Sequence, residues 1–186
     1  MKLTFFYIIY FLIFLILSPL LIFIAIILLI FQGKPIIFWS KRVGKDKKIF
    51  SMPKFRTMKN STPMIATHLL GAPEESVTNI GKFLRKYSLD EIPQIVSLLQ
   101  GHMTIVGPRP ALYNQYDLIS LREQKGLHSI LPGITGLAQI NGRDSISIEE
   151  KVNYDFQYLK EKSIVLDSKI IFLTIFKIFK SSDVSH

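Results

Sequence analysis

The chain has 186 residues, a formal net charge of +9 and a hydrophobic fraction of 48%. This length suits one domain of ordinary size, and the absence of cysteine excludes disulfides and thiolate metal sites. A composition that is both basic and apolar favours a membrane surface or an anionic ligand as the partner. Nucleic acid is not expected, because the sequence contains no recognised nucleic-acid reader motif.

An apolar segment forms the first 32 residues, and no charged residue interrupts it between Lys2 and Lys34. A helix over residues 3–31 would be about 43 Å long, which exceeds the ~30 Å hydrocarbon layer of a bilayer. The segment is too long for a signal peptide and lacks a small-residue cleavage site. Lysines and arginines follow it, which places its C-terminal end on the cytoplasmic side.

Ser18 and Pro19 lie in the middle of this segment. Proline removes a backbone donor and clashes with the preceding turn, so the helix is expected to bend there. On physical grounds the simpler interpretation is a spanning helix with a proline kink. The alternative is a re-entrant helix, whose two halves enter and leave the membrane by the same face.

Residues 33–186 are predicted to form one compact α+β domain that is mostly helical. We expect a short strand over residues 36–39, a loosely alternating stretch over residues 47–58 and an irregular loop over residues 60–77. Thr78 or Asn79 then begins a helix that leads directly into the next one, which ends at Gly101.

Two adjacent carboxylates, Asp90 and Glu91, stand at the predicted start of that second helix. Ser88 and Glu91 have the spacing of a capping box, and Pro93 fits only the first turn of a helix. A carboxylate in this position can cap the helix, hold a metal ion or attack phosphorus. The heptapeptide alone favours simple capping.

Prolines flank Arg109 on both sides and hold its backbone extended. A stiffened arginine suits bidentate phosphate binding, although a solvated arginine in a proline-rich turn is equally compatible with the pattern. A polar helix is predicted over residues 111–127. Glycine-rich turns follow it, and the last of them carries a second arginine, Arg143.

Two helices are predicted at the C-terminal end. The spacing of apolar residues over residues 147–162 predicts an amphipathic helix. Residues 164–180 are very apolar but are interrupted by charges, which is typical of a helix lying in the lipid headgroup region; the alternative is an ordinary core helix.

Four motifs occur in a characteristic order along the chain. They are Lys54-Phe55-Arg56-Thr57-Met58, Ser88-Leu89-Asp90-Glu91, Val106-Gly107-Pro108-Arg109-Pro110, and Pro132-Gly133-Ile134-Thr135-Gly136 with Asn141-Gly142-Arg143. Together they resemble the bacterial sugar transferase family, the small monotopic phosphoglycosyl transferases that begin lipid-linked glycan assembly. The resemblance runs from the apolar N-terminus to the end of the chain.

The resemblance implies transfer of a sugar 1-phosphate from a UDP-sugar to undecaprenyl phosphate, with release of UMP. Asp90 would attack phosphorus and form a covalent intermediate. Asp90 and Glu91 would also contact Mg²⁺, although Glu91 could instead act as a base or orient Asp90. The expected substrate and phosphate contacts are Lys54, Arg56, Arg85, Arg109, Arg143, Asp155 and Asp167. For the last two, a solvated helix face and a helix cap remain alternatives.

The small size of the chain is similar to that of family members that use UDP-N,N′-diacetylbacillosamine in protein glycosylation. UDP-N-acetylhexosamines and UDP-hexoses are alternative donors. The resemblance also implies a re-entrant helix broken at Ser18 and Pro19 over residues 1–32. It further implies a catalytic domain over residues 33–186 on the cytoplasmic face of the bacterial inner membrane, with residues 164–180 at the interface.

Two competing hypotheses need no chemistry at Asp90. One is a membrane-tethered basic module that binds lipid, and the other is a small subunit of a membrane complex. The enzymatic hypothesis, in contrast, requires the Asp90 carboxylate to be reachable from solvent and from the bilayer.

Overall fold

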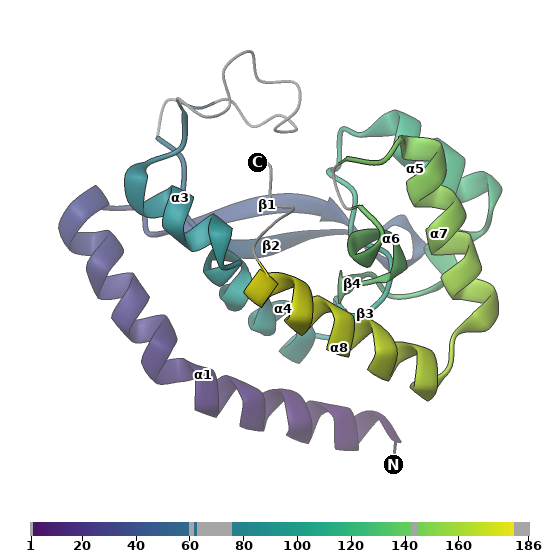
Figure 1. The fold of residues 1–186 in the computed structure, drawn as a ribbon, viewed down its shortest axis with the longest axis horizontal. Helices are drawn as coiled ribbons and strands as arrows, with labels where there is room; N and C mark the ends of the chain where they lie inside the picture. The colour runs from purple at the N-terminus through teal and green to yellow at the C-terminus, as the bar shows by residue number, and fades with distance from the viewer. Residues whose placement is uncertain (1, 60–61, 63–75, 143–144, 181–186) are drawn as a thin grey trace. The chain divides into compact units, whose positions relative to one another are not determined.

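The computed structural model describes residues 2–59, 62, 76–142 and 145–180, and helices predominate in this part of the chain (Figure 1). The predicted class, a mostly helical α+β fold, is confirmed. In chain order the elements are α1 (Lys2–Gln32), β1 (Ile37–Val43), η1 (Lys45–Lys47), β2 (Ile49–Phe55), α3 (Asn79–Lys86), η3 (Leu89–Gln94), α4 (Ile95–Leu99), β3 (Thr104–Val106), α5 (Tyr116–Gln124), η4 (Leu127–Ser129), β4 (Gly133–Thr135), α6 (Leu137–Ile140), α7 (Ile148–Glu161) and α8 (Ile164–Lys180).

The strands form two small sheets. β1 and β2 pair in a two-stranded sheet, and β1 is longer than the strand expected over residues 36–39. β3 and β4 pair in parallel, with Thr104 opposite Gly133 and Val106 opposite Thr135. Gly133 is required in this position because a Cβ there would lie 2.1 Å from the backbone nitrogen of Gly107.

The described residues group into two compact units. The first contains residues 1–40 and 52–100, and the second contains residues 41–51 and 101–183. The division into units reflects which residues pack against one another. It does not test the predicted domain boundary after residue 32, which stays a prediction.

Helix α1 of the first unit continues through Pro19 and bends along its length (Figure 1). Pro19 cannot donate to the carbonyl oxygen of Leu15, four residues earlier, because proline has no N–H. The hydroxyl of Ser18 donates to that same oxygen at 2.8 Å. Ser18 therefore replaces the hydrogen bond that Pro19 removes, which lets the helix pass the proline without interruption.

The surface of α1 is largely apolar and exposed. Among the described residues, one helical stretch, Tyr7–Gln32, is long and apolar enough to cross a membrane by length and composition. Only one side of its C-terminal half is covered: Ile24 and Leu28 are 4% and 1% exposed and pack with Phe55 and Leu84. By contrast, Ile16 and Ile30 are more than 70% exposed.

The second unit is built around α7. Helices α5 and α7 lie side by side and enclose an apolar cluster that contains Leu118 and Val152 (Figure 1). On its other side Tyr158 packs with Val106 of β3 and Ile170 of α8. Ser147 caps α7 in a full capping box with Glu150, as the predicted helix over residues 147–162 requires.

The predicted helix over residues 111–127 is wrong in its first turn, since α5 begins at Tyr116. The side chain of Gln115 accepts a hydrogen bond from the backbone N–H of Leu112 at 2.9 Å. This contact forms a turn, which competes with helix formation at residues 112–115.

Candidate active site

Asp90 and Glu91 lie in η3, a 3₁₀ segment that leads into α4. The predicted capping box is wrong. Ser88 has a left-handed backbone (φ 54°, ψ 23°) and its side chain makes no capping hydrogen bond. The reason is that α3 ends at Lys86 and the chain must turn sharply at Ser88 to begin η3.

The carboxylate of Glu91 is held by a lysine from the neighbouring strand. Nζ of Lys54, in β2, donates to Oε1 of Glu91 at 2.9 Å, and the two side chains are only 16% and 11% exposed. Asp90 is 7% exposed, so it is largely enclosed, and a substrate can reach it only through the small part open to solvent. The structure thus joins Lys54 of β2 to Glu91 of η3, the residue that follows Asp90, within the first unit.

The apolar helix α1 supports this segment directly. Leu89 and Ile92, which flank the two carboxylates, pack against the cluster that contains Ile24 and Leu28 of α1. The position of the Asp90 backbone is therefore fixed by packing on the apolar helix.

Arg85 and Arg56 donate hydrogen bonds to other groups of the protein itself. Nε of Arg85 donates to Oγ1 of Thr57 at 2.9 Å. Nη2 of Arg56 donates to the carbonyl oxygens of Gln32 and Gly33, at 2.6 and 3.1 Å, and so satisfies carbonyls at the end of α1. The predicted phosphate contacts of both arginines stay predictions.

Arg56 also lines a cavity of about 490 Å³ in the first unit. The side-chain amide of Gln32 lies in the wall of this cavity, and its nitrogen and oxygen are buried with no hydrogen-bond partner in the described part of the chain. The remaining lining residues are Phe31, Met58, Lys59, Thr78, Asn79 and Ile80.

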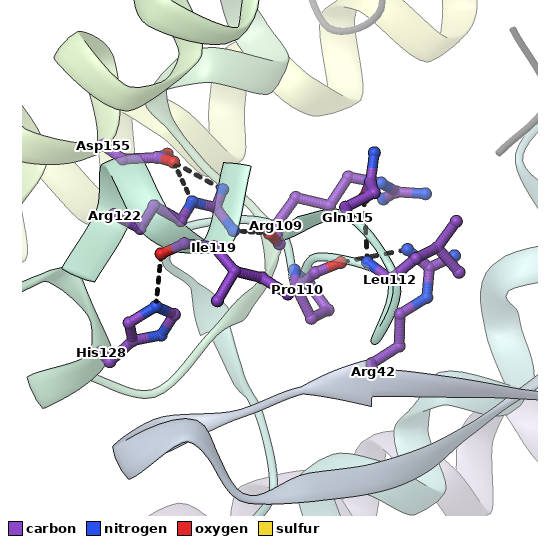
Figure 2. A network of polar contacts seen from close by, with 9 residues as sticks. All are labelled: Arg42, Arg109, Pro110, Leu112, Gln115, Ile119, Arg122, His128 and Asp155. Atoms are coloured by element: carbon purple, nitrogen blue, oxygen red, sulfur yellow. Dashed lines mark hydrogen bonds and ion pairs between the residues drawn. The ribbon is translucent and has the colours of Figure 1, made fainter. Parts of the chain in front are cut away.

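Arg109 belongs to the second unit, where it follows β3. Its carbonyl oxygen accepts a hydrogen bond of 2.8 Å from Nη1 of Arg122, and Arg122 in turn binds the carboxylate of Asp155 (Figure 2). Asp155 is 1% exposed, so the interpretation that it lies on a solvated helix face is wrong. Burial raises the pKa of Asp155, against the opposing attraction of the Arg122 guanidinium.

Asp167 stands in the first turn of α8, where its Oδ1 accepts a hydrogen bond of 2.8 Å from the hydroxyl of Tyr158. The same hydroxyl lies 3.0 Å from the carbonyl oxygen of Val106. Burial, followed by the contact with Asp167, raises the pKa of Tyr158 well above its usual range, so the phenol remains a donor. Arg143 lies outside the described residues.

Sequence reasoning missed Arg122 and Tyr158. A signal for the first was present: Arg122 follows the buried Leu118 by four residues on α5, and Asp155 follows the buried Val152 by three on α7. Charged residues on the apolar faces of two adjacent helices must pair when they are buried.

The two carboxylates of η3 fit Mg²⁺ by their chemistry. Mg²⁺ prefers oxygen ligands and is usually bound through one or two carboxylates together with substrate phosphates and water. Within the described ranges, no group of three or more His, Cys, Asp or Glu side chains is placed to hold a metal. Two carboxylates can hold such an ion together with a substrate phosphate.

These observations define a chain with an apolar N-terminal helix packed beneath a pair of enclosed carboxylates. Comparison with known proteins gives the family. The model of the bacterial sugar transferase family matches residues 1–181, and the chain belongs to this family.

Three relatives illustrate the range of the family. The sugar transferase EpsL of Bacillus subtilis (strain 168) is 39% identical, over 83% of this chain and 75% of its own length. The UDP-glucose:undecaprenyl-phosphate glucose-1-phosphate transferase of Escherichia coli (strain K12) is 41% identical, over 90% of this chain but 38% of its own length. The UDP-N-acetylgalactosamine-undecaprenyl-phosphate N-acetylgalactosaminephosphotransferase of Aeromonas hydrophila is 33% identical, over 85% of this chain and 38% of its own length. The chain thus spans most of EpsL but less than two fifths of the other two.

Proposed function

We propose that this protein transfers a sugar 1-phosphate from a UDP-sugar to undecaprenyl phosphate, giving UMP and an undecaprenyl diphosphate sugar. The observation that carries the proposal is the family match over residues 1–181, which includes the enclosed carboxylate pair. The two relatives named for their substrates act on undecaprenyl phosphate, which supports the same acceptor here.

The proposed reaction has two steps. An oxygen of the Asp90 carboxylate attacks the phosphorus that carries the sugar, and the bond from that phosphorus to the UMP oxygen breaks. A phosphate oxygen of the lipid then attacks the same phosphorus, and the bond to Asp90 breaks, which restores the carboxylate. This division suits a soluble donor and a membrane-held acceptor, because the two need not be bound together.

The enclosure of Asp90 is compatible with this scheme. An acyl phosphate is easily hydrolysed, and an intermediate on a residue that is 7% exposed would be partly shielded from bulk water. Lys54 holds Glu91, the residue that follows Asp90, and in this scheme its positive charge offsets the charge of the phosphate oxygens.

Mg²⁺, when bound by Asp90 and Glu91 with a substrate phosphate, would neutralise charge on the diphosphate. We assign the remaining phosphate contacts to Arg85, Arg109 and Arg143. Arg109 is the best supported of the three, because hydrogen bonds fix its backbone.

We further propose that the catalytic residues lie on the cytoplasmic face of the bacterial inner membrane and that α1 is re-entrant. The bend in α1 and the exposed apolar side chains on both α1 and α8 support a position at the bilayer surface. A Lys2→Cys variant tests the topology in intact cells with a reagent that does not cross membranes. Labelling from outside would contradict the re-entrant helix.

The identity of the donor sugar is a separate proposal. The named relatives use UDP-glucose and UDP-N-acetylgalactosamine, so a hexose or N-acetylhexosamine donor has the support of the comparisons. UDP-N,N′-diacetylbacillosamine stays a prediction. A panel of these donors with undecaprenyl phosphate, followed by UMP release, identifies the sugar.

Intact-mass analysis tests the covalent step. The full chain is mixed with the accepted UDP-sugar and Mg²⁺ in the absence of lipid acceptor, and one added phosphosugar is expected. Asp90→Asn should lose both the adduct and turnover. Asp46→Asn is the matched control, because Asp46 is exposed and its left-handed backbone (φ 53°) suits asparagine. An active Asp90→Asn protein would exclude the mechanism. A wild-type chain that releases no UMP from any donor would favour a lipid-binding module.

A further inference from the structure

The backbone that carries Arg109 is held by several hydrogen bonds from within the second unit. Four consecutive carbonyl oxygens, those of residues 108–111, accept a bond from another element. The donors are Gly133 N to Pro108 (2.9 Å), Arg122 Nη1 to Arg109 (2.8 Å), Arg42 Nη1 to Pro110 (3.1 Å) and Val43 N to Ala111 (3.0 Å).

Arg122 is the donor that acts at Arg109 itself. Its Nε and Nη2 bind Oδ2 of Asp155 at 3.1 and 2.6 Å, while its third nitrogen, Nη1, points to the Arg109 carbonyl. The two side chains of the pair are 7% and 1% exposed. Figure 2 shows the Arg109 side chain extending away from Arg122, which leaves its guanidinium on the other side of the loop.

We propose that Arg122, oriented by Asp155, is a positioning residue that fixes the backbone of Arg109 so that the Arg109 guanidinium meets a substrate phosphate in one geometry. The inference rests on the proposed function, since Arg109 is our candidate phosphate contact.

Charge and burial support this role over a direct contact of Asp155 with substrate. A carboxylate that is 1% exposed and already binds a guanidinium through Oδ2 offers no surface to a ligand, and it would repel a diphosphate. A buried ion pair is weak evidence for stability, because the loss of hydration offsets the attraction between the charges. What the pair does provide is a fixed orientation of three nitrogen donors.

Substitution with lysine separates positioning from simple packing. Arg122→Lys keeps a cation beside Asp155 but has one nitrogen, which cannot bind Asp155 as a fork and also hold the Arg109 carbonyl. In the wild-type background we expect kcat/KM for the UDP-sugar to fall about tenfold or more, mainly through kcat. In an Arg109→Lys background, adding Arg122→Lys should lower kcat/KM by less than about threefold. The reason is that a lysine ammonium on a flexible chain depends less on backbone position than a planar arginine guanidinium does.

Glu123→Gln provides the matched control. Glu123 is the next residue on α5, but it is exposed and forms its ion pair with Lys47 at the surface. The Glu123→Gln substitution should leave kcat/KM unchanged in both the wild-type and the Arg109→Lys backgrounds. An equal loss from Arg122→Lys in both backgrounds would overturn the inference, since a merely structural role predicts independent effects.

Hydrogen exchange supplies a readout that does not need activity. In full-length protein, the backbone amides of residues 106, 107, 109, 111 and 112 should exchange faster in Arg122→Lys than in wild type, and Glu123→Gln should match wild type. Unchanged exchange in Arg122→Lys would overturn the inference even in a protein that transfers no sugar. Faster exchange in a protein with no UMP release from any donor would support the positioning contact and reject the proposed function.

Discussion

The ion pair between Lys54 and Glu91 gives a sharp prediction, because it joins the strand β2 to the carboxylate segment. The perturbation is Lys54→Met, which keeps the length of the side chain and removes its charge. The substitution takes away the cation that holds Oε1 of Glu91 while that carboxylate stays enclosed at 11% exposure.

The magnitude follows from the separation and the burial. At 2.9 Å and an effective dielectric constant of about 20, the attraction between the charges is about 6 kcal/mol. Desolvation of the two ions offsets several kcal/mol of that figure. Removing one partner of a fully buried pair costs about 3–5 kcal/mol, and the residual exposure here lowers the expected loss to about 2–3 kcal/mol. For a chain of this size the loss corresponds to a Tm lower by about 4–12 °C.

Thermal unfolding in one detergent, followed by circular dichroism, measures the shift. Lys47→Met is the control, because its ion pair with Glu123 is 52% and 55% exposed and exposed pairs contribute little. The double variant Lys54→Met/Glu91→Gln should lose less stability than the sum of the two single variants. Equal shifts for Lys54→Met and Lys47→Met would refute the reasoning.

Three further predictions concern the described core. Gly81→Ala places a Cβ 2.1 Å from the carbonyl oxygen of Thr57 and should cost about 1–3 kcal/mol, measured as a lower Tm. Tyr158→Phe removes the hydroxyl that donates to Asp167 and should cost about 1–3 kcal/mol in the same assay. Because burial raises the pKa of Asp155, the native state binds this proton more tightly than the unfolded chain does, so stability falls as pH rises through the raised pKa. The measured quantity is the difference in Tm between wild type and Asp155→Asn, and it should decrease from pH 4 upward. An increase would show that the attraction of Arg122 outweighs the effect of burial on the pKa of Asp155.

Local patterns in the sequence predicted the helices where their contacts are local. The helix predicted over residues 147–162 is present as α7, where Ser147 and Glu150 form a capping box, and Thr78 caps α3 through the N–H of Gly81. The same spacing failed at Ser88 and Glu91. There the carboxylate binds Lys54, which is 37 residues away in the sequence, and a spacing rule contains no information about such a contact.

The candidate site was predictable as a set of residues but not as an arrangement. The position of Asp90 and Glu91 at the start of a helical segment was correct, while the enclosure of Asp90 depends on the packing of Leu89 and Ile92 against another helix. Hydropathy marked α1 as a membrane segment. It did not indicate that one side of that segment forms part of a hydrophobic core.

That shared side of α1 bears on how the protein can be handled. Removing the first 32 residues to obtain a water-soluble fragment would take away the apolar surface on which the Asp90 segment packs, together with the proposed membrane anchor. The loss of Ile24 and Leu28 would leave a cavity next to Leu89 and Ile92. A fragment made in this way should be inactive for want of support, and preparations that keep native lipids around the helix should be the ones that turn over.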